Sequence, residues 1–286
     1  MQLHRDTEIL IVGLGLLGGS YALALKKKGF RRIGGIAHRR ETVDYALDHG
    51  MIDYGSAIVD PQLIARAELI VFALYPTVLV QWMKDYGHLI SAGTVVTDVT
   101  GVKSCIIEPV RAALPEGAEF VAVHPMAGRE VCGIENADET IFQGANYIVV
   151  PVERNTEDAL RLCEDLGREL GFGRISRLSP QAHDEMIAFL SQLTHCVAVS
   201  LMCANDDPRL VDYTGDSFRD LTRIARINDL MWSELFVANK SALLDQMDLF
   251  INKFNELKTM LETEDIDGMR SMMRHSTERR ALFDKK

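Results

Sequence analysis

The chain has few cysteines and no surplus of positive charge. Its five cysteines are Cys105, Cys132, Cys163, Cys196 and Cys203, with no Cys-x-x-Cys pair and no zinc-like spacing to histidines. We therefore expect reduced, mostly buried thiols and no metal site. Lysine and arginine number 31 against 41 aspartates and glutamates, a formal net charge of −10. That balance argues against a nucleic-acid partner, which requires a basic surface.

The sequence also lacks long uninterrupted apolar runs, because glycine, lysine or aspartate breaks the longest stretches. Residues Met1–Glu8 have neither the apolar core nor the cleavage site of a secretory signal. We expect no membrane partner and a cytoplasmic location. At 286 residues, 47% of them hydrophobic, the chain is long enough for two globular domains.

Short apolar runs alternate with helical stretches over the first 176 residues, which is typical of βαβ units. The runs expected to form buried strands of a parallel sheet are Glu8–Val12, Arg32–Ile36, Leu69–Leu74, Thr94–Thr97, Phe120–Val123 and Tyr147–Val150. Ser179 and Pro180 then mark a helix start, and helical periodicity follows to the end. The pattern predicts an α/β Rossmann-type dinucleotide-binding domain over residues 1–176 and an all-helical substrate and dimerisation domain over residues 177–286.

A glycine-rich turn follows the first predicted strand and reads Gly13-Leu-Gly15-Leu16-Leu17-Gly18. Gly13 permits a tight turn, Gly15 lets a pyrophosphate approach the backbone, and Gly18 allows the next helix to pack on the strand. The helix N-terminus then faces the phosphates. We expect this turn, including Leu16 and Leu17, to bind a nicotinamide dinucleotide.

The end of the second predicted strand indicates which nicotinamide cofactor is used. An acid there bonds the adenosine 2′-hydroxyl of NAD, whereas arginine pairs with the 2′-phosphate of NADP. The chain has Ala37 near the position of the acid, followed by His38, Arg39 and Arg40. The sequence therefore favours NADP over NAD, although the arginines also fit as ordinary exposed residues opening the next helix.

His124 follows the apolar run Phe120–Val123, which places an imidazole at the carboxyl end of a predicted strand. Ligands of open parallel sheets collect at that edge, so His124 can meet the reactive end of a nicotinamide. Together with the glycine turn, this position predicts a hydride-transfer enzyme.

Three blocks carry a family resemblance: Asp98-Val-Thr-Gly-Val-Lys103, His124-Pro-Met-Ala-Gly-Arg-Glu130 and Phe218-Arg-Asp-Leu-Thr-Arg-Ile-Ala225. With them the chain closely resembles the prephenate dehydrogenases over nearly its whole length. The resemblance implies oxidative decarboxylation of prephenate to 4-hydroxyphenylpyruvate in tyrosine synthesis. It also implies that neutral His124 accepts the proton of the ring hydroxyl as hydride leaves.

The resemblance implies roles for residues around the substrate as well. Arg223 matches the family's carboxylate-binding arginine, and His195 matches a histidine that lines the substrate pocket. Glu130 falls near the pocket entrance, and Arg129 adds a cation for the substrate. These positions suit a dianionic substrate, which needs charge-assisted contacts once water is removed.

One position departs from the family. Many relatives have a serine where this chain has Gly101, and that hydroxyl contacts the catalytic histidine and the nicotinamide. Thr100 is the nearest replacement, and we expect its hydroxyl to orient His124.

Several alternatives remain open on the sequence. Arogenate competes with prephenate as substrate, and His195 leans weakly toward prephenate. A β-hydroxyacid dehydrogenase or pyrroline carboxylate reductase would depend on a group such as Lys240, which leaves His124 unexplained. A sensor that binds NADP without turnover fits Gly101 but not His124 and Arg223. Apolar surface in the helical domain predicts a homodimer.

Overall fold

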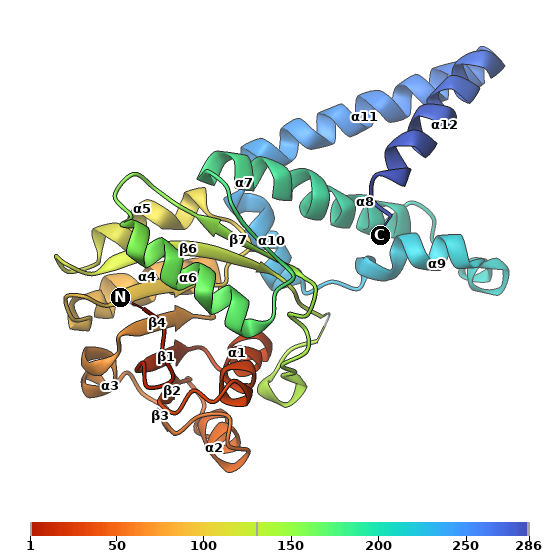
Figure 1. Cartoon of the computed structure of the whole chain (residues 1–286). Coiled ribbons are helices and arrows are strands. Elements are labelled where there is room, and N and C mark those ends of the chain that lie inside the picture. The colour runs from red at the N-terminus through yellow and green to blue at the C-terminus, as the bar shows by residue number, and fades with distance from the viewer. Residues whose placement is uncertain (1, 130, 285–286) are drawn as a thin grey trace. The chain divides into compact units, whose positions relative to one another are not determined.

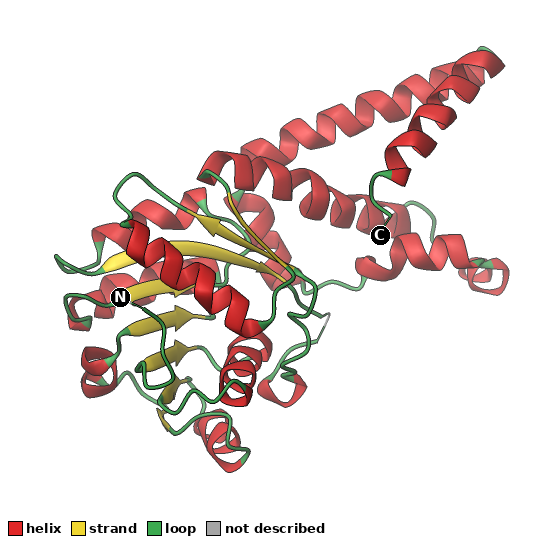
Figure 2. Cartoon of the chain, in the orientation of Figure 1, coloured by secondary structure: helices red, strands yellow, loops and turns green. Residues whose placement is uncertain are grey.

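The computed structural model describes residues 2–129 and 131–284, and it divides the chain into two compact units, Met1–Asn239 and Lys240–Lys286. The first unit contains an eight-stranded sheet with helices on both of its faces (Figures 1 and 2). The second unit contains two helices, α11 (Lys240–Glu262) and α12 (Ile266–Ala281), which pack against each other. Each unit is described by itself.

The sheet has the strand order β3-β2-β1-β4-β5-β6-β7-β8. The strands are β1 (Ile9–Val12), β2 (Ile33–Ile36), β3 (Tyr54–Ser56), β4 (Leu69–Phe72), β5 (Val95–Asp98), β6 (Glu119–Met126), β7 (Asn146–Val150) and β8 (Arg174–Arg177). The first six strands pair in parallel, and the order reverses between β1 and β4, where doubly wound sheets bind their ligands. The Rossmann-type fold predicted from the sequence is confirmed.

Three features of the sheet differ from the expectation. Strands β3 and β8 were not predicted, because they are three- and four-residue edge strands without a continuous apolar run. Strand β7 is antiparallel to β6, so the sheet is mixed rather than parallel. Strand β6 also continues to Met126, which places His124 inside the strand and past its last parallel pair, Thr97 with Val121.

The two faces of the sheet bury separate apolar cores because side chains alternate along each strand. Ile9 and Ile11 face one core, whereas Leu10 and Val12 face the other. Each core is closed by helices on its side of the sheet. The helices of this α/β part are α1 (Leu16–Lys27), α2 (Arg40–Asp48), α3 (Pro61–Arg66), α4 (Pro76–Tyr86), α5 (Ser104–Ala112) and α6 (Glu157–Leu170).

A long helical stretch follows β8, as the sequence predicted. Helix α7 (Pro180–Ile187) runs through a π-helical segment (Ala188–Leu193) directly into α8 (Thr194–Cys203). The Ser179 hydroxyl caps α7 by accepting from the backbone of Ala182, at 3.2 Å. The remaining helices of the first unit are α9 (Asp216–Thr222) and α10 (Asp229–Ala238).

This continuous helix corrects the expectation that no segment reaches membrane-spanning length. Pro180–Cys203 is long and apolar enough to cross a membrane by length and composition, with a mean hydropathy of 1.7 in its most apolar window. One such helix is weak evidence of a membrane span, because core helices of soluble proteins can have the same length and composition. The same helix carries buried polar side chains at His183, Asp184 and Gln192, which contact the rest of the first unit.

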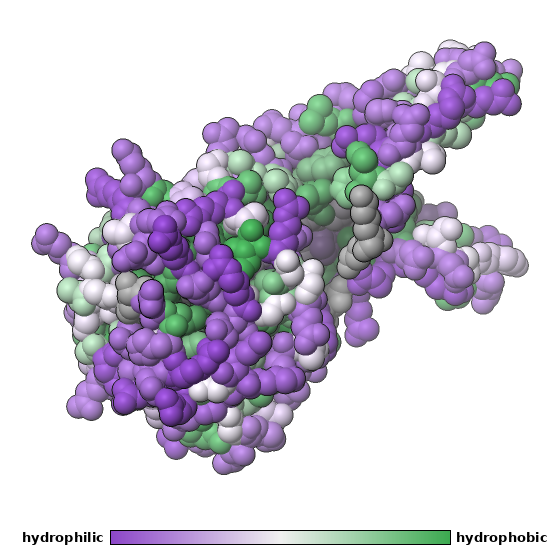
Figure 3. Space-filling view, in the orientation of Figure 1, coloured by the Kyte–Doolittle hydropathy of each residue, from purple (hydrophilic) through white to green (hydrophobic). Residues whose placement is uncertain are grey.

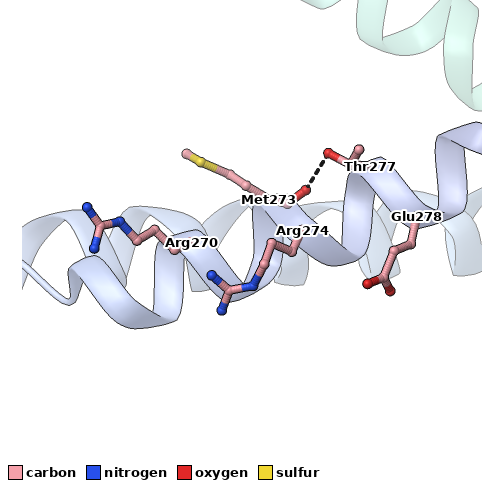
Figure 4. A pocket seen from close by; sticks show the side chains of 5 residues that line it. All are labelled: Arg270, Met273, Arg274, Thr277 and Glu278. Carbon is pink, nitrogen blue, oxygen red and sulfur yellow. Dashed lines mark hydrogen bonds between the residues drawn. The ribbon is translucent and has the colours of Figure 1, made fainter.

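Surface features of the structure bear on one further expectation, that of mostly buried thiols. Hydrophilic side chains cover much of the visible face around the sheet (Figure 3). The cysteines are all free, but Cys163 alone is fully buried while Cys132 and Cys203 are exposed, so the expectation of mostly buried thiols is wrong. A hollow in the second unit lies along the single helix α12, with Arg270 and Glu278 among its lining residues (Figure 4).

Candidate active site

The glycine turn after β1 has the geometry of a dinucleotide cradle. Gly13 has a φ of 99°, and a Cβ there would lie 2.4 Å from the carbonyl oxygen of Ala73. A Cβ on Gly18 would lie 1.9 Å from the carbonyl oxygen of Gly13, so only glycine allows α1 to pack this closely. A Cβ on Gly15 would meet no atom within 4 Å. The backbone at Gly15 is therefore open to a phosphate group, as a bound dinucleotide requires.

Leu16 and Leu17 open α1 directly after this turn, and both are half-buried. The first turn of α1 contains no acidic residue, so no carboxylate there repels a phosphate at the helix N-terminus. Leu17 packs against the core on the α1 side of the sheet. Leu17 thus supports the turn through packing, and neither leucine has a side-chain hydrogen-bonding group to offer a ligand.

The end of β2 presents cations and no acid. Ala37 is buried at the position where an acid would bind a ribose, and His38, Arg39 and Arg40 are exposed after it. The Arg40 guanidinium is paired with Asp44 one helical turn later, at 2.9 Å. Arg39 has no ion pair among the residues that the structure describes. Arg39 is therefore the better placed of the two arginines to receive an external anion.

A buried ion pair joins the ends of β5 and β6. The Lys103 ammonium lies 2.6 Å from Asp98 Oδ2, and both side chains are fully buried. The same two groups bind the backbone of Val123: Asp98 Oδ1 accepts from its N–H at 3.1 Å, and Lys103 donates to its carbonyl at 2.5 Å. These side-chain bonds take the place of backbone hydrogen bonds between β5 and β6, whose last paired residues are Thr97 and Val121. The backbone next to His124 is thereby fixed.

His124 is bonded to a second histidine from α7. Its Nδ1 lies 2.9 Å from Nε2 of His183, and Nδ1 of His183 lies 2.7 Å from Oδ1 of Asp184. His183 is completely buried, Asp184 nearly so, and His124 is half-buried. Asp184 also accepts from the backbone N–H groups of Lys103 and Ser104, at 2.9 and 2.8 Å. The three side chains form one continuous hydrogen-bonded row that ends at His124.

Burial and charge keep both imidazoles neutral. Burial lowers the pKa of His124 well below its ordinary value of 6.5, and the neighbouring His183 and Lys103 lower this pKa further. Burial also lowers the pKa of His183, although its bond to Asp184 opposes the shift. Burial raises the pKa of Asp184, but bonds from His183 and Ser104 outweigh this effect and the net pKa is below its ordinary value. His124 is therefore a neutral acceptor at physiological pH.

The structure corrects the expectation that Thr100 orients His124. The Thr100 hydroxyl donates to Asp98 Oδ2 at 2.5 Å and also contacts the Val102 carbonyl and the Lys103 ammonium. Adjacent residues in this turn point in different directions, and the position that faces His124 is Gly101. A Cβ on Gly101 would lie 4.0 Å from His124 Nε2.

Helix α10 borders the site on the side of Gly101. The methyl groups of Leu235 lie 3.6 and 3.7 Å from the position of a Cβ on Gly101. Trp232, one turn earlier on the same helix, stacks on the ring of His195 with centroids 3.7 Å apart. His195 Nδ1 lies 2.9 Å from the Ser191 carbonyl and donates to it, because a carbonyl only accepts. His195 thus belongs to the wall that continues from Gly101 along α10.

Buried amides fix α10 on the long helix. Gln192, in the π-helical segment, donates to the Leu235 carbonyl at 2.9 Å. Asn239 donates to the Gln192 side-chain oxygen at 2.8 Å and to the Asp184 carbonyl at 2.9 Å. These bonds connect the helix that carries His183 with the helix that carries Leu235.

Two of the remaining predicted substrate residues, Arg223 and Arg129, lie in different parts of the first unit. Arg223 begins a 3₁₀ turn (Arg223–Ala225) that packs against α8, the helix of His195, and it is exposed. Arg129 pairs with Asp138 at 2.5 Å, and the Asp138 N–H donates to Ser20 of α1 at 3.0 Å. Arg129 is therefore fixed beside the nucleotide turn rather than beside His195. Glu130 lies outside the described residues.

The sequence did not single out His183 and Asp184. Both lie just past the first turn of the helix that starts after Ser179, where an acid and a histidine are unremarkable. The signal available was the pair of adjacent His and Asp residues on a helix that leads into His195. Their contact with His124 depends on a separation of 59 residues, which no local pattern reveals.

Comparison with known proteins identifies relatives of the whole chain. Residues 21–175 match the family model described as prephenate dehydrogenase, nucleotide-binding domain, and residues 179–275 match prephenate dehydrogenase, dimerization domain. The prephenate dehydrogenase of Bacillus subtilis is 32% identical over 276 residues, which are 94% of this chain and 74% of that protein. The cyclohexadienyl dehydrogenase of Zymomonas mobilis is 27% identical over 96% of this chain and 94% of that protein.

Solved structures agree with these sequence relatives. The crystal structure of prephenate dehydrogenase from A. aeolicus in complex with hydroxyphenyl propionate and NAD+ has a TM-score of 0.89 and 26% identity. The match covers 99% of this chain and 100% of that chain. The Synechocystis arogenate dehydrogenase has a TM-score of 0.84 at 24% identity, over 96% and 99% of the two chains, and shows the same fold.

Proposed function

The chain belongs to the prephenate dehydrogenase family, and from this membership we propose that it oxidises and decarboxylates prephenate to 4-hydroxyphenylpyruvate, a step of tyrosine synthesis. The observation that carries the proposal is the position of His124. This neutral imidazole lies past the last parallel pair of β5 and β6, on the side of the sheet edge where the glycine turn of β1 also ends. A base and a nucleotide cradle at one sheet edge are what a hydride-transfer enzyme needs.

His124 has a defined task in this reaction. Its Nε2 accepts the hydrogen bond of the substrate's ring hydroxyl and takes the proton as that carbon is oxidised. The O–H bond electrons become the second bond of a carbonyl, and a bound nicotinamide supplies the acceptor for the hydride. As the ring carboxylate leaves as CO₂, the electrons of its C–C bond complete the aromatic ring, and the carbonyl oxygen takes the proton back from His124 to become the phenol of the product. The pKa of His124, lowered by burial, keeps the imidazole neutral and ready to accept before the reaction begins.

Substrate recognition is assigned to the helical wall. We infer that Arg223 pairs with a substrate carboxylate and that His195, held by Trp232 and Ser191, contributes a hydrogen bond. Arg223 lies on a turn that packs against the helix of His195, which supports their acting on one ligand. Arg129 has Asp138 as its partner on the nucleotide side, so it is not included in this set.

NADP is the proposed cofactor. Its 2′-phosphate needs a cation after β2, and exposed Arg39 lies there without any acid at the preceding position, Ala37. NAD remains the second cofactor to be assayed, because the relative with a TM-score of 0.89 was crystallised with NAD+.

A homodimer is proposed on two grounds. Residues 179–275 match a dimerization domain. The long helix also exposes large apolar side chains, including Phe189 at 53%, Leu190 at 44% and Met202 at 46% exposure. A second copy that covers these residues would remove them from water. Sedimentation equilibrium should give twice the chain mass of 32.0 kDa, and a mass that stays at one chain across micromolar concentrations would contradict this.

The proposed function is tested by one two-by-two assay of prephenate and arogenate with NAD and NADP. We expect the highest kcat/KM for prephenate with NADP. A clear preference for arogenate would reassign the substrate while leaving the chemistry intact. No reduction of either cofactor with either substrate would contradict the proposed enzyme activity and support a nucleotide-binding role without turnover.

His124→Asn is the matching variant for the chemistry. We expect kcat to fall by about 10²–10⁴-fold, the usual contribution of a general base, while the Kd for NADP stays within about threefold. An equal loss of turnover and cofactor binding would show that His124 is structural.

A further inference from the structure

We propose that His183 and Asp184 are positioning residues that fix the tautomer of His124, so that the proton sits on Nδ1 and the lone pair on Nε2. This inference rests on the proposed function, in which Nε2 of His124 is the base. The inference goes beyond the proposed function because it assigns two residues on α7 to the orientation and protonation state of that base. The inference follows from the direction of each hydrogen bond along the row.

The direction is set at the Asp184 end. Asp184 accepts from three N–H groups, those of His183 Nδ1, the Lys103 backbone and the Ser104 backbone. A carboxylate that receives three donors remains ionised and has no hydrogen to give. Nδ1 of His183 must therefore carry the hydrogen of its 2.7 Å bond to Asp184.

The next bond then has only one possible direction. His183 is fully buried, and a buried imidazole holds a single ring proton because the charged form is disfavoured. With that proton on Nδ1, its Nε2 can only accept. The 2.9 Å bond between the two rings is therefore donated by Nδ1 of His124.

The free nitrogen of His124 faces the position where a substrate fits. A neutral ring with its proton on Nδ1 has the lone pair on Nε2. No residue in the described part of the chain hydrogen-bonds Nε2, which lies 4.0 Å from a Cβ position on Gly101. Because Gly101 has no side chain, the hydroxyl of the substrate is the group that can approach Nε2. The hydrogen-bonded row from Asp184 thus holds His124 in the tautomer whose Nε2 can accept a proton from the substrate.

Asp184→Asn tests this assignment because the amide can donate where the carboxylate only accepted. Donation to Nδ1 of His183 would reverse the row and move the hydrogen of His124 to Nε2. We expect kcat with prephenate to fall by at least about a hundredfold, while KM and the Kd for NADP stay within about threefold. Glu185→Gln is the matched control: the same chemical change on the next residue, at an exposed site without contact to His183.

A pair of variants at His183 separates positioning from structural support. His183→Gln offers an amide that can accept from His124 and donate to Asp184, so it should retain most of the wild-type kcat. His183→Leu fills similar space without hydrogen bonds and should lose kcat as Asp184→Asn does. Equal activity of the Gln and Leu variants, at equal thermal stability, would contradict the positioning role.

A spectroscopic readout makes the proposal independent of turnover. Protein labelled with ¹⁵N in its histidines reports which ring nitrogen of His124 is protonated, and the His124→Asn spectrum assigns the signals. We expect protonated Nδ1 in the wild type and protonated Nε2 in Asp184→Asn. Protonated Nε2 in the wild type would overturn the proposal even if the enzyme is active. Protonated Nδ1 without turnover of prephenate or arogenate would instead contradict the proposed function alone.

Discussion

Single residues around His124 divide into those that hold the backbone and those that hold the ring. Asp98 and Lys103 bind the amide and carbonyl of Val123, so they fix where the strand carries the imidazole. His183 binds the ring itself. A buried ion pair such as Asp98 with Lys103 adds little net stability relative to apolar packing, but removal of one partner leaves an uncompensated charge.

Thr100→Val separates these two roles at the residue level. The valine removes a hydroxyl bonded to Asp98 but keeps its volume, so we expect the free energy of unfolding to fall by about 1–3 kcal/mol. Because the hydroxyl does not contact His124, kcat should stay within a few fold. Urea denaturation and steady-state kinetics on the same preparation check both values. A large loss of kcat at unchanged stability would show that the Thr100 hydroxyl does contribute to catalysis.

The sequence predicts part of this residue-level picture. His124 was identified because it directly follows a four-residue apolar run, which is local information. The roles of His183 and Asp184 could not be predicted, since they depend on how α7 meets the end of β6. The role expected for Thr100 was wrong, because neither spacing nor composition states which of two adjacent residues points toward a ring.

At the level of elements, the proposed preference for NADP depends on the turn between β2 and α2. Arg39 and Arg40 are adjacent and have the same charge, but Arg40 already forms an ion pair with Asp44. The two positions therefore serve as each other's control. They are both exposed, so substitutions there leave the fold intact.

Arg39→Ala should raise the Kd for NADP by more than Arg40→Ala does. The reason is that the Arg39 guanidinium has no ion pair among the described residues, whereas that of Arg40 is paired with Asp44. A lost charge-assisted contact costs about 1.5–3 kcal/mol, roughly a 10- to 150-fold change in affinity. The Kd for NAD should change little in either variant. Fluorescence titration of both cofactors measures these constants. Equal losses for NAD and NADP would contradict recognition of the 2′-phosphate.

The contact between α10 and the long helix gives a second prediction at this level. Asn239→Leu leaves the Gln192 side-chain oxygen without its donor, whereas the Asp184 carbonyl keeps the backbone N–H of Ala188 as a partner. The unsatisfied buried oxygen costs about 1–3 kcal/mol. We expect a lower melting temperature and, because α10 borders Gly101, a raised KM for prephenate. Gln181→Ala on the exposed side of α7 is the control and should change neither value. Unchanged stability in Asn239→Leu would mean that these bonds contribute nothing net.

Elements differ in how well the sequence predicts them. The central strands were found because they are buried on both faces and consist of continuous apolar runs. The edge strands β3 (Tyr-Gly-Ser) and β8 (Arg-Ile-Ser-Arg) have no such run. The antiparallel direction of β7 was not predictable either, because direction depends on the route of the chain between strands.

For the whole molecule, the lowered pKa values of His124 and His183 predict how stability depends on pH. In the unfolded chain, His124 and His183 bind protons near pH 6.5, whereas in the folded protein they bind them only at lower pH. The unfolded state therefore takes up more protons below pH 6.5, and the free energy of unfolding falls as pH decreases. The slope is at most about 1.4 kcal/mol per pH unit for each histidine, and it declines to zero as pH rises through 6.5 to roughly 8.

Urea denaturation at several pH values between 5 and 7.5 measures this slope. His124→Asn removes one of the two groups, so its stability should depend less steeply on pH than that of the wild type. The control is His38→Asn, which makes the same substitution at an exposed histidine outside the row of His124 and His183. Parallel slopes for wild type and His124→Asn would show that His124 is protonated equally in both states.

The strand order also sets a length scale across the sheet. The glycine turn follows β1 and the imidazole is on β6, and β4 and β5 lie between these strands. Three interstrand steps of roughly 4.8 Å separate them by about 14 Å. A compound that carries only the adenosine half of the dinucleotide, such as 2′,5′-ADP, can therefore fill the cradle and stop short of the base. Such a fragment should compete with the intact cofactor but leave the space beside Gly101 open, which makes it a means to trap and study the substrate complex before oxidation.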